Sequence, residues 1–583
     1  MAGISQLIST ALSSPASPAC PFQRGRRSQA SAPRRPRAAR PAVISCESRP
    51  PERVDRREVL LGLGGMCAAG GLGIGRDALA LPIQAPDLSK CQPTGTNSGT
   101  NCCPPYDATI VDYKFTPTGP PRVRPAAHTV DEAYLAKYKK AVKLMRELPP
   151  DDPRSFAQQA NVHCAYCDGA YDQVGFPGLE LQVHNSWLFF PFHRFYLHFH
   201  ERILGKLIGD ESFALPFWNW DAPAGMTLPK IYTDPRSSLY DPLRDAAHQP
   251  PALVDFDLGD AAPTAQRQID LNLSIMYRQM ISSARTTKLF MGQPYRAGGN
   301  RNPGSGSLET SPHGPVHVWV GDPKQPNGEN MGIFYSAARD PIFYAHHANV
   351  DRMWHLWKKL DPRNVDFTDG DWLESSFLFY DEAARLVRVK VKDCLEPEML
   401  GFTYQNVEVP WLRNRATPRS APSAASSSTS SSSKNQRRAK LLKSARETAS
   451  FPLTLSSAAS VSVKRPKVSR SPADKDKEEE ILVVEGIEFN GEVCVKFDVY
   501  VDETDTADVK PDDSEFAGSF VNVPHRKGHN TKMAAVKTTL RLGISDLLED
   551  LKLEDEEELL VTLVPRKGKG KFNIGGVRIE LSS

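Results

Sequence analysis

One stretch of this 583-residue chain has a composition that cannot fold around a core, and it divides the sequence into two parts. Between Ser423 and Ser433 nearly every residue is serine, and a basic cluster at 436–438 and a run of mixed charge follow. Such a segment buries too little apolar area to offset the entropy lost on ordering it. We therefore predict a disordered, protease-sensitive linker over 414–479, with folded domains at 81–413 and 480–583.

The first 80 residues have the composition of a targeting segment. Residues 1–46 contain seven arginines and no acidic residue, and are rich in serine, alanine and proline, as organelle transit peptides are. Twin arginines at 56–57 then precede an apolar run over 59–74, and Ala-Leu-Ala at 78–80 offers a cleavage site. We predict that 1–80 is a chloroplast transit peptide followed by a twin-arginine signal, so that the twin-arginine export machinery delivers the mature chain to the thylakoid lumen.

Charge and hydropathy exclude two classes of partner. The formal net charge is only +3, which provides no large surplus of cations to neutralise nucleic-acid phosphates. The apolar run at 59–74 is interrupted by glycines and is shorter than the ~20 residues that a membrane-spanning helix needs. We expect neither nucleic-acid binding nor a transmembrane anchor.

Residues 81–413 have the patterns of a mainly helical domain with a helical-bundle core. Apolar spacing suited to a helix runs from Asp131 to Leu148 and stops at two prolines. The stretches from Asn185 to Ile208 and from Pro341 to Lys359 are further long helix candidates. Most of the chain's histidines lie in or beside these helical segments.

Residues 480–583 have strand patterns instead. Alternate positions from Val493 to Val501 are apolar, which is the period of a half-buried strand. A β-sandwich of about 100 residues fits such spacing. Its histidine pair, His525 and His529, lies in a polar loop, where we expect neither a metal site nor a catalytic role. Further strands are expected at 559–564 and 577–581.

The 14 histidines of the chain gather mainly in three places. Imidazole is the commonest metal ligand in proteins and suits copper, zinc, iron or nickel. Two sets of three histidines in one domain would hold two ions. The histidines concerned are His163, His184, His193, His198 and His200 in the first place, His313 and His317 in the second, and His346 and His347 in the third.

The spacing of the histidines along the chain distinguishes only some of the candidate metal ligands. His313 and His317 are four residues apart and would share one face of a helix. His193 and His200 are seven apart and would also share a face, so the first place stays ambiguous. Asp351 lies one turn after His347, where its carboxylate could orient that ring through a hydrogen bond.

Cysteine usage fits a compartment outside the reducing cytosol. Four cysteines near the start of the mature chain could form two disulfides, whereas two later ones lie in apolar surroundings and are expected to be inert buried thiols. The four are Cys91, Cys102, Cys103 and Cys164, and the two are Cys394 and Cys494. Residues 102 and 103 are adjacent, which disulfide geometry disfavours as a pair.

Several motifs together resemble those of one family. His163 to Cys167 reads His-Cys-Ala-Tyr-Cys, and 188–200 and 346–354 are rich in histidine and aromatic residues. Asp-Trp-Leu at 371–373 and Lys-Phe-Asp-Val at 496–499 lie downstream. These segments, spread over nearly the whole chain, resemble the paired copper motifs and the two later signature segments of plant polyphenol oxidases, also called catechol oxidases. The first of these signatures falls inside the predicted catalytic domain, near 371–413.

The resemblance implies a ligand set and covalent links. Two copper ions per chain would be bound, the first by His163, His184 and His193 and the second by His313, His317 and His347. Cys167 would form a thioether with His184, and the disulfides would join Cys91 to Cys103 and Cys102 to Cys164. His198, His200 and His346 would then be structural or would support the ligands.

The same resemblance implies an activity. Small phenols and O2 are the substrates: o-diphenols are oxidised to o-quinones while O2 is reduced to water. Phe334 would be an aromatic gate above the second copper, and Glu309 would hold a water in the site. The residues after the ligands at 313 and 317 are Gly314 and Val318, which cannot hold that water, so monophenolase activity is expected to be weak or absent.

The C-terminal domain is expected to cover the copper site and keep the enzyme latent. Two other functions stay open at this point: a hemocyanin-like oxygen carrier without significant turnover, and a storage protein with vestigial histidines. Zinc could occupy such sites but has no redox chemistry. Exposure to catechol distinguishes the carrier from the oxidase, and copper content distinguishes the storage protein.

Overall fold

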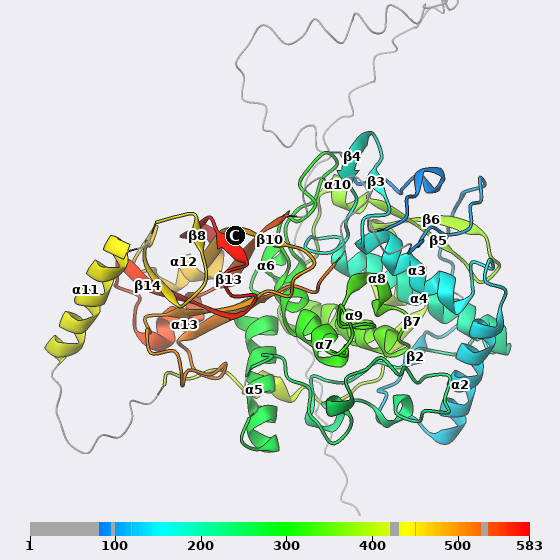
Figure 1. Ribbon diagram of the computed structural model, residues 1–583, viewed down its shortest axis with the longest axis horizontal. Coiled ribbons are helices and arrows are strands. Elements are labelled where there is room, and N and C mark those ends of the chain that lie inside the picture. Colours follow the sequence, from blue (N-terminus) through cyan, green and yellow to red (C-terminus); the bar gives the residue numbers. More distant parts are fainter. Residues whose placement is uncertain are drawn as a thin grey trace, which may run out of the picture. The chain divides into compact units, whose positions relative to one another are not determined.

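The computed structural model describes residues 81–94, 100–117, 119–259, 262–419, 431–448, 450–525 and 535–583. The predicted targeting signals at 1–80 and His529 lie outside the described residues. Element labels are those of Figure 1. Residues 81–419 are called the central domain below, and residues 450–583 the C-terminal domain.

Four long helices form the frame of the central domain (Figure 1): α2 (Glu132–Glu147), α3 (Phe156–Cys167), α4 (Phe189–Ile208) and α9 (Ile342–Leu360). The side chain of Asp131 accepts a hydrogen bond from the backbone of Tyr134 at the start of α2, and Ser155 caps α3 in the same way. Helix α4 ends at Gly209, whose φ of 68° is easily adopted only by glycine. The three predicted helices therefore exist, with starts shifted by one to four residues.

Shorter elements connect these helices. The further helices are α5 (Ala265–Tyr277), α6 (Thr287–Met291), α7 (Gly314–Val320), α8 (Phe334–Ala337) and α10 (Gly370–Leu373), with π-helical turns η6 (Arg278–Ser282) and η7 (Glu309–His313). The 3-10 turns are η2 (Leu88–Lys90), η3 (Pro223–Gly225), η4 (Lys230–Tyr232), η5 (Ala246–His248), η8 (Val391–Asp393), η9 (Pro397–Leu400) and η10 (Pro410–Arg413). Three small sheets order as β1-β6-β5, β2-β7 and β3-β4, from β1 (Val111–Asp112), β2 (Arg122–Arg124), β3 (Asp172–Gln173), β4 (Phe176–Glu180), β5 (Ser376–Tyr380), β6 (Leu386–Lys390) and β7 (Phe402–Tyr404).

The core of the central domain holds paired charges as well as aromatic rings. The guanidinium of Arg194 is buried and donates to Asp351 at 2.5 Å, while buried Arg124 donates to Glu201 at 2.8 Å. Charges are buried in proteins when a partner and hydrogen bonds compensate their desolvation. These ion pairs join helix α4 to helix α9 and to strand β2, and both helices also carry histidines.

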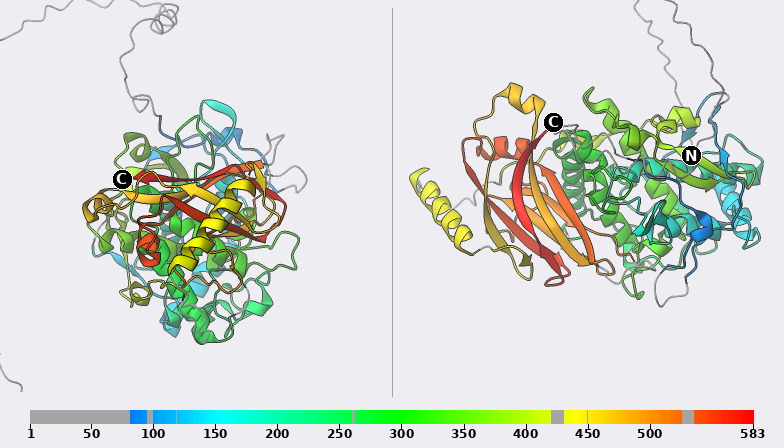
Figure 2. Two further views of the ribbon diagram at one scale, coloured as in Figure 1. Left: turned by 90° about the vertical axis from the view of Figure 1, so that its left-hand side faces the viewer. Right: turned by 90° about the horizontal axis from the view of Figure 1, so that it is seen from above.

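The C-terminal domain consists of two antiparallel sheets. One orders β13-β10-β15-β8, with β16 also paired to β10, and the other orders β12-β11-β14-β9 (Figure 2). The strands are β8 (Leu453–Thr454), β9 (Ala459–Lys464), β10 (Glu479–Asn490), β11 (Lys496–Val501), β12 (Phe516–Val521), β13 (Ala535–Gly543), β14 (Glu558–Lys567), β15 (Phe572–Ile574) and β16 (Gly576–Ser582). Helices α12 (Pro472–Lys477) and α13 (Ser545–Leu551) flank them. Stacked rings of Phe497, Phe520 and Phe572, drawn from both sheets, lie in one apolar cluster.

The linker prediction is wrong over much of its length. Residues 431–448 form helix α11, whose Leu442 and Ala445 are buried against Leu560 of β14, and Figure 2 shows this helix beside the C-terminal strands. Strand β9 pairs with β14 although it lies in the segment predicted to be disordered. The two buried valines of β9 alternate with polar residues over a stretch too short to change the average composition. The C-terminal domain therefore starts well before residue 480, and residues 420–430 and 449 of the predicted linker lie outside the described residues.

None of the helices in the described ranges is long and apolar enough to cross a membrane.

Candidate metal centre

Two groups of buried histidines meet inside the central domain. Ligand atoms of His163, His184 and His193 lie within 4.8 Å of one another, and so do those of His313, His317, His346 and His347. The rings of His193 and His347 stack with their centroids 4.1 Å apart. The two groups are therefore neighbours, as a pair of adjacent ions requires.

Helices supply most of these rings. His163 lies on α3 and His193 on α4, while His184 lies in the loop that precedes α4. His313 ends the π-helical turn η7 and His317 lies on α7, so these two are not on one regular α-helix as the spacing predicted. Their ring centroids are nevertheless 4.7 Å apart.

Backbone carbonyls fix the orientation of four rings by accepting hydrogen bonds at Nδ1. The acceptors are Phe334 for His163 (2.9 Å), Phe189 for His193 (2.8 Å), Glu309 for His313 (3.0 Å) and Met331 for His317 (2.9 Å). A neutral imidazole that donates from Nδ1 carries a bare lone pair on Nε2. All four rings therefore present a lone pair toward the centre.

These lone pairs have no protein donor. The Nε2 atoms of His163, His193 and His313 are buried without a partner among the described residues. Nε2 of His317 faces Nε2 of His347 at 3.2 Å. Burying unpaired acceptors is costly, and a cation shared by the rings removes that cost. The arrangement therefore fits metal ions bound by imidazole, as copper commonly is.

Burial also keeps these rings in the protonation state that metal binding needs. Desolvation lowers the pKa of His193 to about 3 and that of His317 to about 4. The pKa of His163, His184, His313 and His347 is lowered well below the usual value for the same reason. The rings are neutral near pH 7, and only a neutral ring can donate its lone pair to a metal.

The second group contains one histidine more than the resemblance assigned. Trp220 donates its Nε1 proton to Nδ1 of His346 at 3.1 Å. An indole nitrogen is only a donor, so the proton of this neutral ring must lie on Nε2. His346 has then no lone pair left for a metal, whereas His347 faces His317. The hydrogen bond distinguishes the two adjacent histidines, which spacing alone does not.

Asp351 does not orient His347 as its spacing suggested. Its carboxylate accepts from Arg194 and from the hydroxyl of Tyr404, and it lies 3.5 Å from Arg124. The carboxylate of Asp351 is therefore paired with the buried arginines and does not orient the His347 ring. The next residue, Arg352, pairs at 3.0 Å with Asp221, and both side chains are buried.

Phe334 lies against the first histidine group rather than above the second. Its ring stacks on His184 at a centroid distance of 4.3 Å and contacts the edge of His163 at 5.7 Å. Its own carbonyl is the acceptor that orients His163. Phe334 thus packs on two rings of the first group and orients one of them through its carbonyl.

Glu309 is a buried carboxylate at the edge of the centre. One oxygen, Oε1, accepts the backbone N–H of Asn185 at 2.6 Å, while Oε2 has no partner in the described parts of the chain. Burial raises the pKa of Glu309 to about 8. Asn185 could not be predicted from the sequence, because no motif rule singles out an asparagine after a histidine.

The cysteines pair as the resemblance implied. Disulfides join Cys91 to Cys103 and Cys102 to Cys164. Cys167 and Cys394 are buried thiols, and Cys494 is half-buried. Cys167 ends the helix that carries His163, and its carbonyl accepts from the amide of Gln182, two residues before His184.

The remaining histidines of the first place lie elsewhere on α4. The His200 ring stacks on Tyr344 with centroids 3.6 Å apart, and His198 packs against Phe115 at 5.4 Å. Neither belongs to a group of convergent ligand atoms found in the described ranges. His193 and His200 are therefore not ligands of one metal ion, although they are seven residues apart on the same helix.

The C-terminal domain reaches this centre. The Phe334 N–H donates to the carbonyl of Pro524 at 3.1 Å, and the His525 ring stacks on Phe334 with centroids 5.7 Å apart. His525 is only 7% exposed, although the residues that follow it in the sequence are polar. A cavity of only about 30 Å³ remains between the domains, with His184, Glu309 and Val523 among its lining residues. A phenol does not fit there while the domain stays in place.

Ion pairs join the two domains outside this contact. Lys496, 1% exposed, lies 2.9 Å from Asp257 of the central domain and 3.1 Å from Asp498 on its own strand. Arg278 donates to the carbonyls of Pro511 at 3.0 Å and Asp513 at 3.3 Å. The signature lysine of the 496–499 segment is thus a contact between domains.

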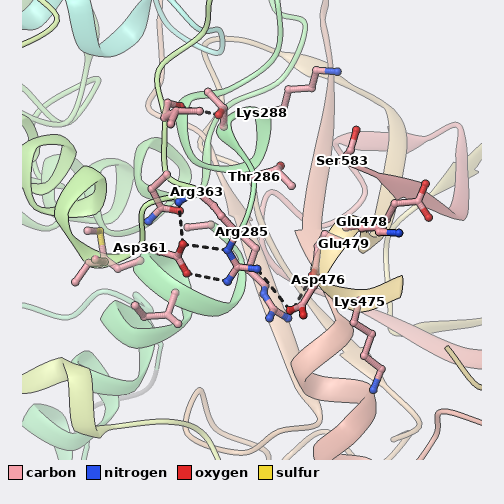
Figure 3. A pocket seen from close by; sticks show the side chains of 18 of the residues that line it. Arg285, Thr286, Lys288, Asp361, Arg363, Lys475, Asp476, Glu478, Glu479 and Ser583 are labelled. Atoms are coloured by element: carbon pink, nitrogen blue, oxygen red, sulfur yellow. Dashed lines mark hydrogen bonds and ion pairs between the residues drawn. The ribbon is translucent and has the colours of Figure 1, made fainter. Parts of the chain in front are cut away.

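Another cavity, of about 740 Å³, lies along the same boundary and away from the histidines (Figure 3). Arg285 lies 3.1 Å from Asp546 and 3.6 Å from Glu479, and Arg363 lies 3.6 Å from Asp476. Both of these arginines, which line the cavity, are thus paired with carboxylates. This cavity is therefore a seam between domains and not the reaction site.

Comparison with known proteins agrees with this geometry. Three family profiles match: the common central domain of tyrosinase at residues 153–360, the polyphenol oxidase middle domain at 366–417, and the chloroplastic polyphenol oxidase C-terminal domain at 451–581. The last begins just before strand β8, in line with the corrected domain boundary.

Relatives match over nearly the whole length. The chain is 54% identical over 581 residues to a chloroplastic polyphenol oxidase of Malus domestica, covering 97% of each, and 54% identical over 514 residues to aureusidin synthase of Antirrhinum majus, covering 86% and 89%. The structure of latent apple tyrosinase matches with 55% identity and a TM-score of 0.74, covering 82% of this chain and all of that one.

Several relatives are named chloroplastic, which supports a chloroplast location here. The tyrosinase-type domain and the histidine groups together imply a type-3 dicopper centre that oxidises phenols with O2. On this match of sequence, fold and site, the chain belongs to the plant polyphenol oxidases of the tyrosinase family and has the domains of their latent form.

Proposed function

We propose that this polyphenol oxidase is a catechol oxidase that binds two copper ions, one at His163, His184 and His193 and the other at His313, His317 and His347. The observation that carries the assignment is the set of buried Nε2 lone pairs held by Nδ1–carbonyl hydrogen bonds. Copper, when bound, cycles between Cu(I) and Cu(II), and so passes two electrons from a diphenol toward O2. The protein keeps the rings neutral, fixes their direction and excludes bulk water.

Copper analysis and oxygen uptake test this assignment together. The mature chain from residue 81 should contain two coppers and consume one O2 for every two catechols oxidised to quinone. A chain that binds two coppers and O2 but does not turn over catechol would instead be an oxygen carrier. Copper well below two per chain with no turnover would contradict the ligand sets.

We expect a preference for diphenols over monophenols. Gly314 follows the ligand His313 and offers no side chain to share a water with Glu309, whose Oε2 lies beside the cavity without a partner among the described residues. A monophenol must lose its proton and gain an oxygen, which demands more from that carboxylate than a catechol does. Rates with tyramine and catechol, measured in parallel, test this; comparable rates would contradict it.

We also propose a thioether between Sγ of Cys167 and the ring of His184. The Gln182 amide donates to the Cys167 carbonyl while its Oε1 accepts from the backbone of Val183 and His184, so the two segments are already tied together. A covalent link would fix a ring that has no hydrogen-bonded nitrogen among the described residues. Peptide mass spectrometry should find the pair two hydrogens lighter than the separate peptides and stable to reductants; unlinked peptides would refute it.

The C-terminal domain is proposed to keep the enzyme latent by covering the centre. Cutting the linker should activate only when the cut lies in an accessible stretch. Residues 420–433 contain no lysine or arginine, and the basic residues at 437, 438, 440 and 443 lie on helix α11. A recognition site for a sequence-specific protease, inserted near Ser426, is therefore a better test than trypsin. A catechol rate that does not rise severalfold after the domain has left would refute the proposal.

The proposed location is the thylakoid lumen. An import assay with isolated chloroplasts tests it, since replacing both Arg56 and Arg57 by lysine should leave the chain in the stroma. Delivery to the lumen in spite of these changes would contradict the twin-arginine route.

A further inference from the structure

The backbone conformation of Asn185 is unusual and bears directly on Glu309. Its φ of 57° lies in the left-handed region. Residues other than glycine rarely adopt this conformation, and asparagine is among those that tolerate it best. In this conformation the backbone N–H of Asn185 donates to Oε1 of Glu309 at 2.6 Å. Such local strain persists only where surrounding contacts hold it.

One loop supplies those contacts. The Asn185 amide donates to Oδ1 of Asn302 at 3.2 Å, and its own Oδ1 accepts from the hydroxyl of Ser305 at 2.7 Å. The Asn185 carbonyl accepts the N–H of Gly304 at 3.0 Å. Residues 302–305 therefore hold both the side chain and the backbone of this residue.

These contacts of Asn185 restrict the carboxylate of Glu309. With Oε1 engaged, Glu309 cannot rotate freely, and the oxygen without a partner among the described residues is Oε2. Asn185, Ser305 and Glu309 line the same small cavity as Phe334. The carboxylate of Glu309 therefore presents a defined oxygen to the cavity beside the histidine groups.

We infer that Asn185 is a positioning residue for Glu309, held in place by Asn302 and Ser305. The inference rests on the proposed function, in which Glu309 forms a hydrogen bond with the phenol hydroxyl, directly or through a water. That hydrogen bond would orient the phenol toward the ions that the two histidine groups would hold. Asn185 contributes by fixing the Glu309 carboxyl group and does not itself touch the phenol.

The test loosens the loop without changing the residue next to a ligand. Ser305→Ala removes the hydroxyl that holds Asn185, and Ser305→Thr retains a hydroxyl. The matched control is Ser307→Ala, on the same loop, because the Ser307 hydroxyl donates to the carbonyl of Gln279 instead. All are measured in the copper-loaded full chain under the conditions that activate the unaltered chain.

For Ser305→Ala we expect kcat with catechol to fall about tenfold while KM changes less than about twofold, since misplacement of a reacting group weakens the chemical step rather than binding. Ser305→Thr should restore most of the rate, and Ser307→Ala should leave it unchanged. Copper content should stay constant. Copper loss in Ser305→Ala, or equal losses in Ser305→Ala and Ser307→Ala, would overturn the inference by showing that the loop only holds the fold.

A double-mutant cycle with Glu309→Gln separates this inference from the proposed function. If Asn185 acts through Glu309, Ser305→Ala should cost nothing further once Glu309 is replaced. A full additional tenfold loss would overturn the positioning role while leaving the role of Glu309 intact. If Glu309→Gln itself retained full activity, the proposed function of Glu309 would fail, and the positioning role with it.

Discussion

The histidine centre and the boundary that covers it are built from different kinds of contact. Around the centre, neutral rings are oriented by backbone carbonyls, and the charges beneath, such as Arg194 with Asp351, pair within one domain and are buried. At the boundary many of the contacts are ion pairs between domains, several of them partly exposed, as for Arg267 with Asp512. Boundaries between domains resemble transient interfaces in being polar. We infer that the centre is a fixed part of the central domain and that the C-terminal domain can separate from it.

The largest loss of catechol turnover is expected when a proposed copper ligand is removed. His347→Ala should remove one copper and reduce catechol turnover at least about 100-fold, because even groups that only support a ligand typically cost 10–100-fold. The adjacent His346→Leu is the matched control, since its hydrogen bond from Trp220 leaves it no lone pair for a metal. Metal analysis and oxygen uptake check both. A chain that loses copper with His346→Leu and keeps it with His347→Ala would reverse the assignment.

A smaller effect is expected from the buried lysine of the boundary. Lys496→Met leaves the carboxylates of Asp257 and Asp498 without their cation, and breaking one partner of a buried pair is strongly destabilising. The uncut chain should lose latency, with its catechol rate rising about tenfold or more. Asp257→Asn should act in the same direction from the central domain.

Arg566→Met provides the control for this prediction. Arg566 pairs with Asp498 inside the C-terminal domain at 2.5 Å and is not part of the boundary. Its loss should leave the chain latent. If Arg566→Met activated the chain as strongly as Lys496→Met, the effect would come from unfolding of the C-terminal domain and not from the boundary.

Acid should weaken the cover through His525. Burial against Phe334 lowers the pKa of His525 to about 4, from an ordinary value of 6.5, and the charge of Arg301 acts in the same direction. The released domain binds a proton that the docked domain cannot, so docking loses stability as pH falls from 6.5 through 4. Glu479 opposes this, because burial raises its pKa to about 7 and its protonation favours the docked state.

Removing the histidine should therefore reverse the pH response. His525→Leu should leave the uncut chain more latent at pH 4.5 than at pH 7, whereas the unaltered chain should be severalfold more active at pH 4.5 when each rate is divided by that of the cut chain. Rates that rise equally with acid in both chains would show that another group releases the domain.

The parts that the sequence predicted are those with a local signal. The helix over 132–147 has amphipathic spacing and a cap, and the histidine motifs are specific enough to indicate a copper site. Strand β9 and helix α11 were missed, because a few apolar residues such as Leu442 are diluted by serine and lysine around them. Composition averages over a window longer than the element that folds.

Contacts between distant segments could not be predicted from either spacing or composition. Asp351 is one turn from His347, yet Arg194, more than 150 residues earlier, takes its carboxylate. Trp220 decides which of two adjacent histidines keeps a lone pair, and nothing in the local sequence shows that it approaches them. His525 is surrounded in sequence by polar residues but is buried by the other domain.

The smallest effect is expected from the exposed edge of the seam. Arg363 and Asp476 face each other at 3.6 Å with 56% and 71% of their side chains exposed (Figure 3), and exposed ion pairs contribute between zero and about 1 kcal/mol. Arg363 also pairs at 2.7 Å with Asp361 in its own domain, so it gains little from the boundary. Arg363→Ala should change the catechol rate of the uncut chain less than about twofold. Arg285→Ala, beside the buried carboxylate of Glu479, should raise that rate more. Equal effects of the two changes would mean that the boundary depends on its total charge and not on its buried pairs.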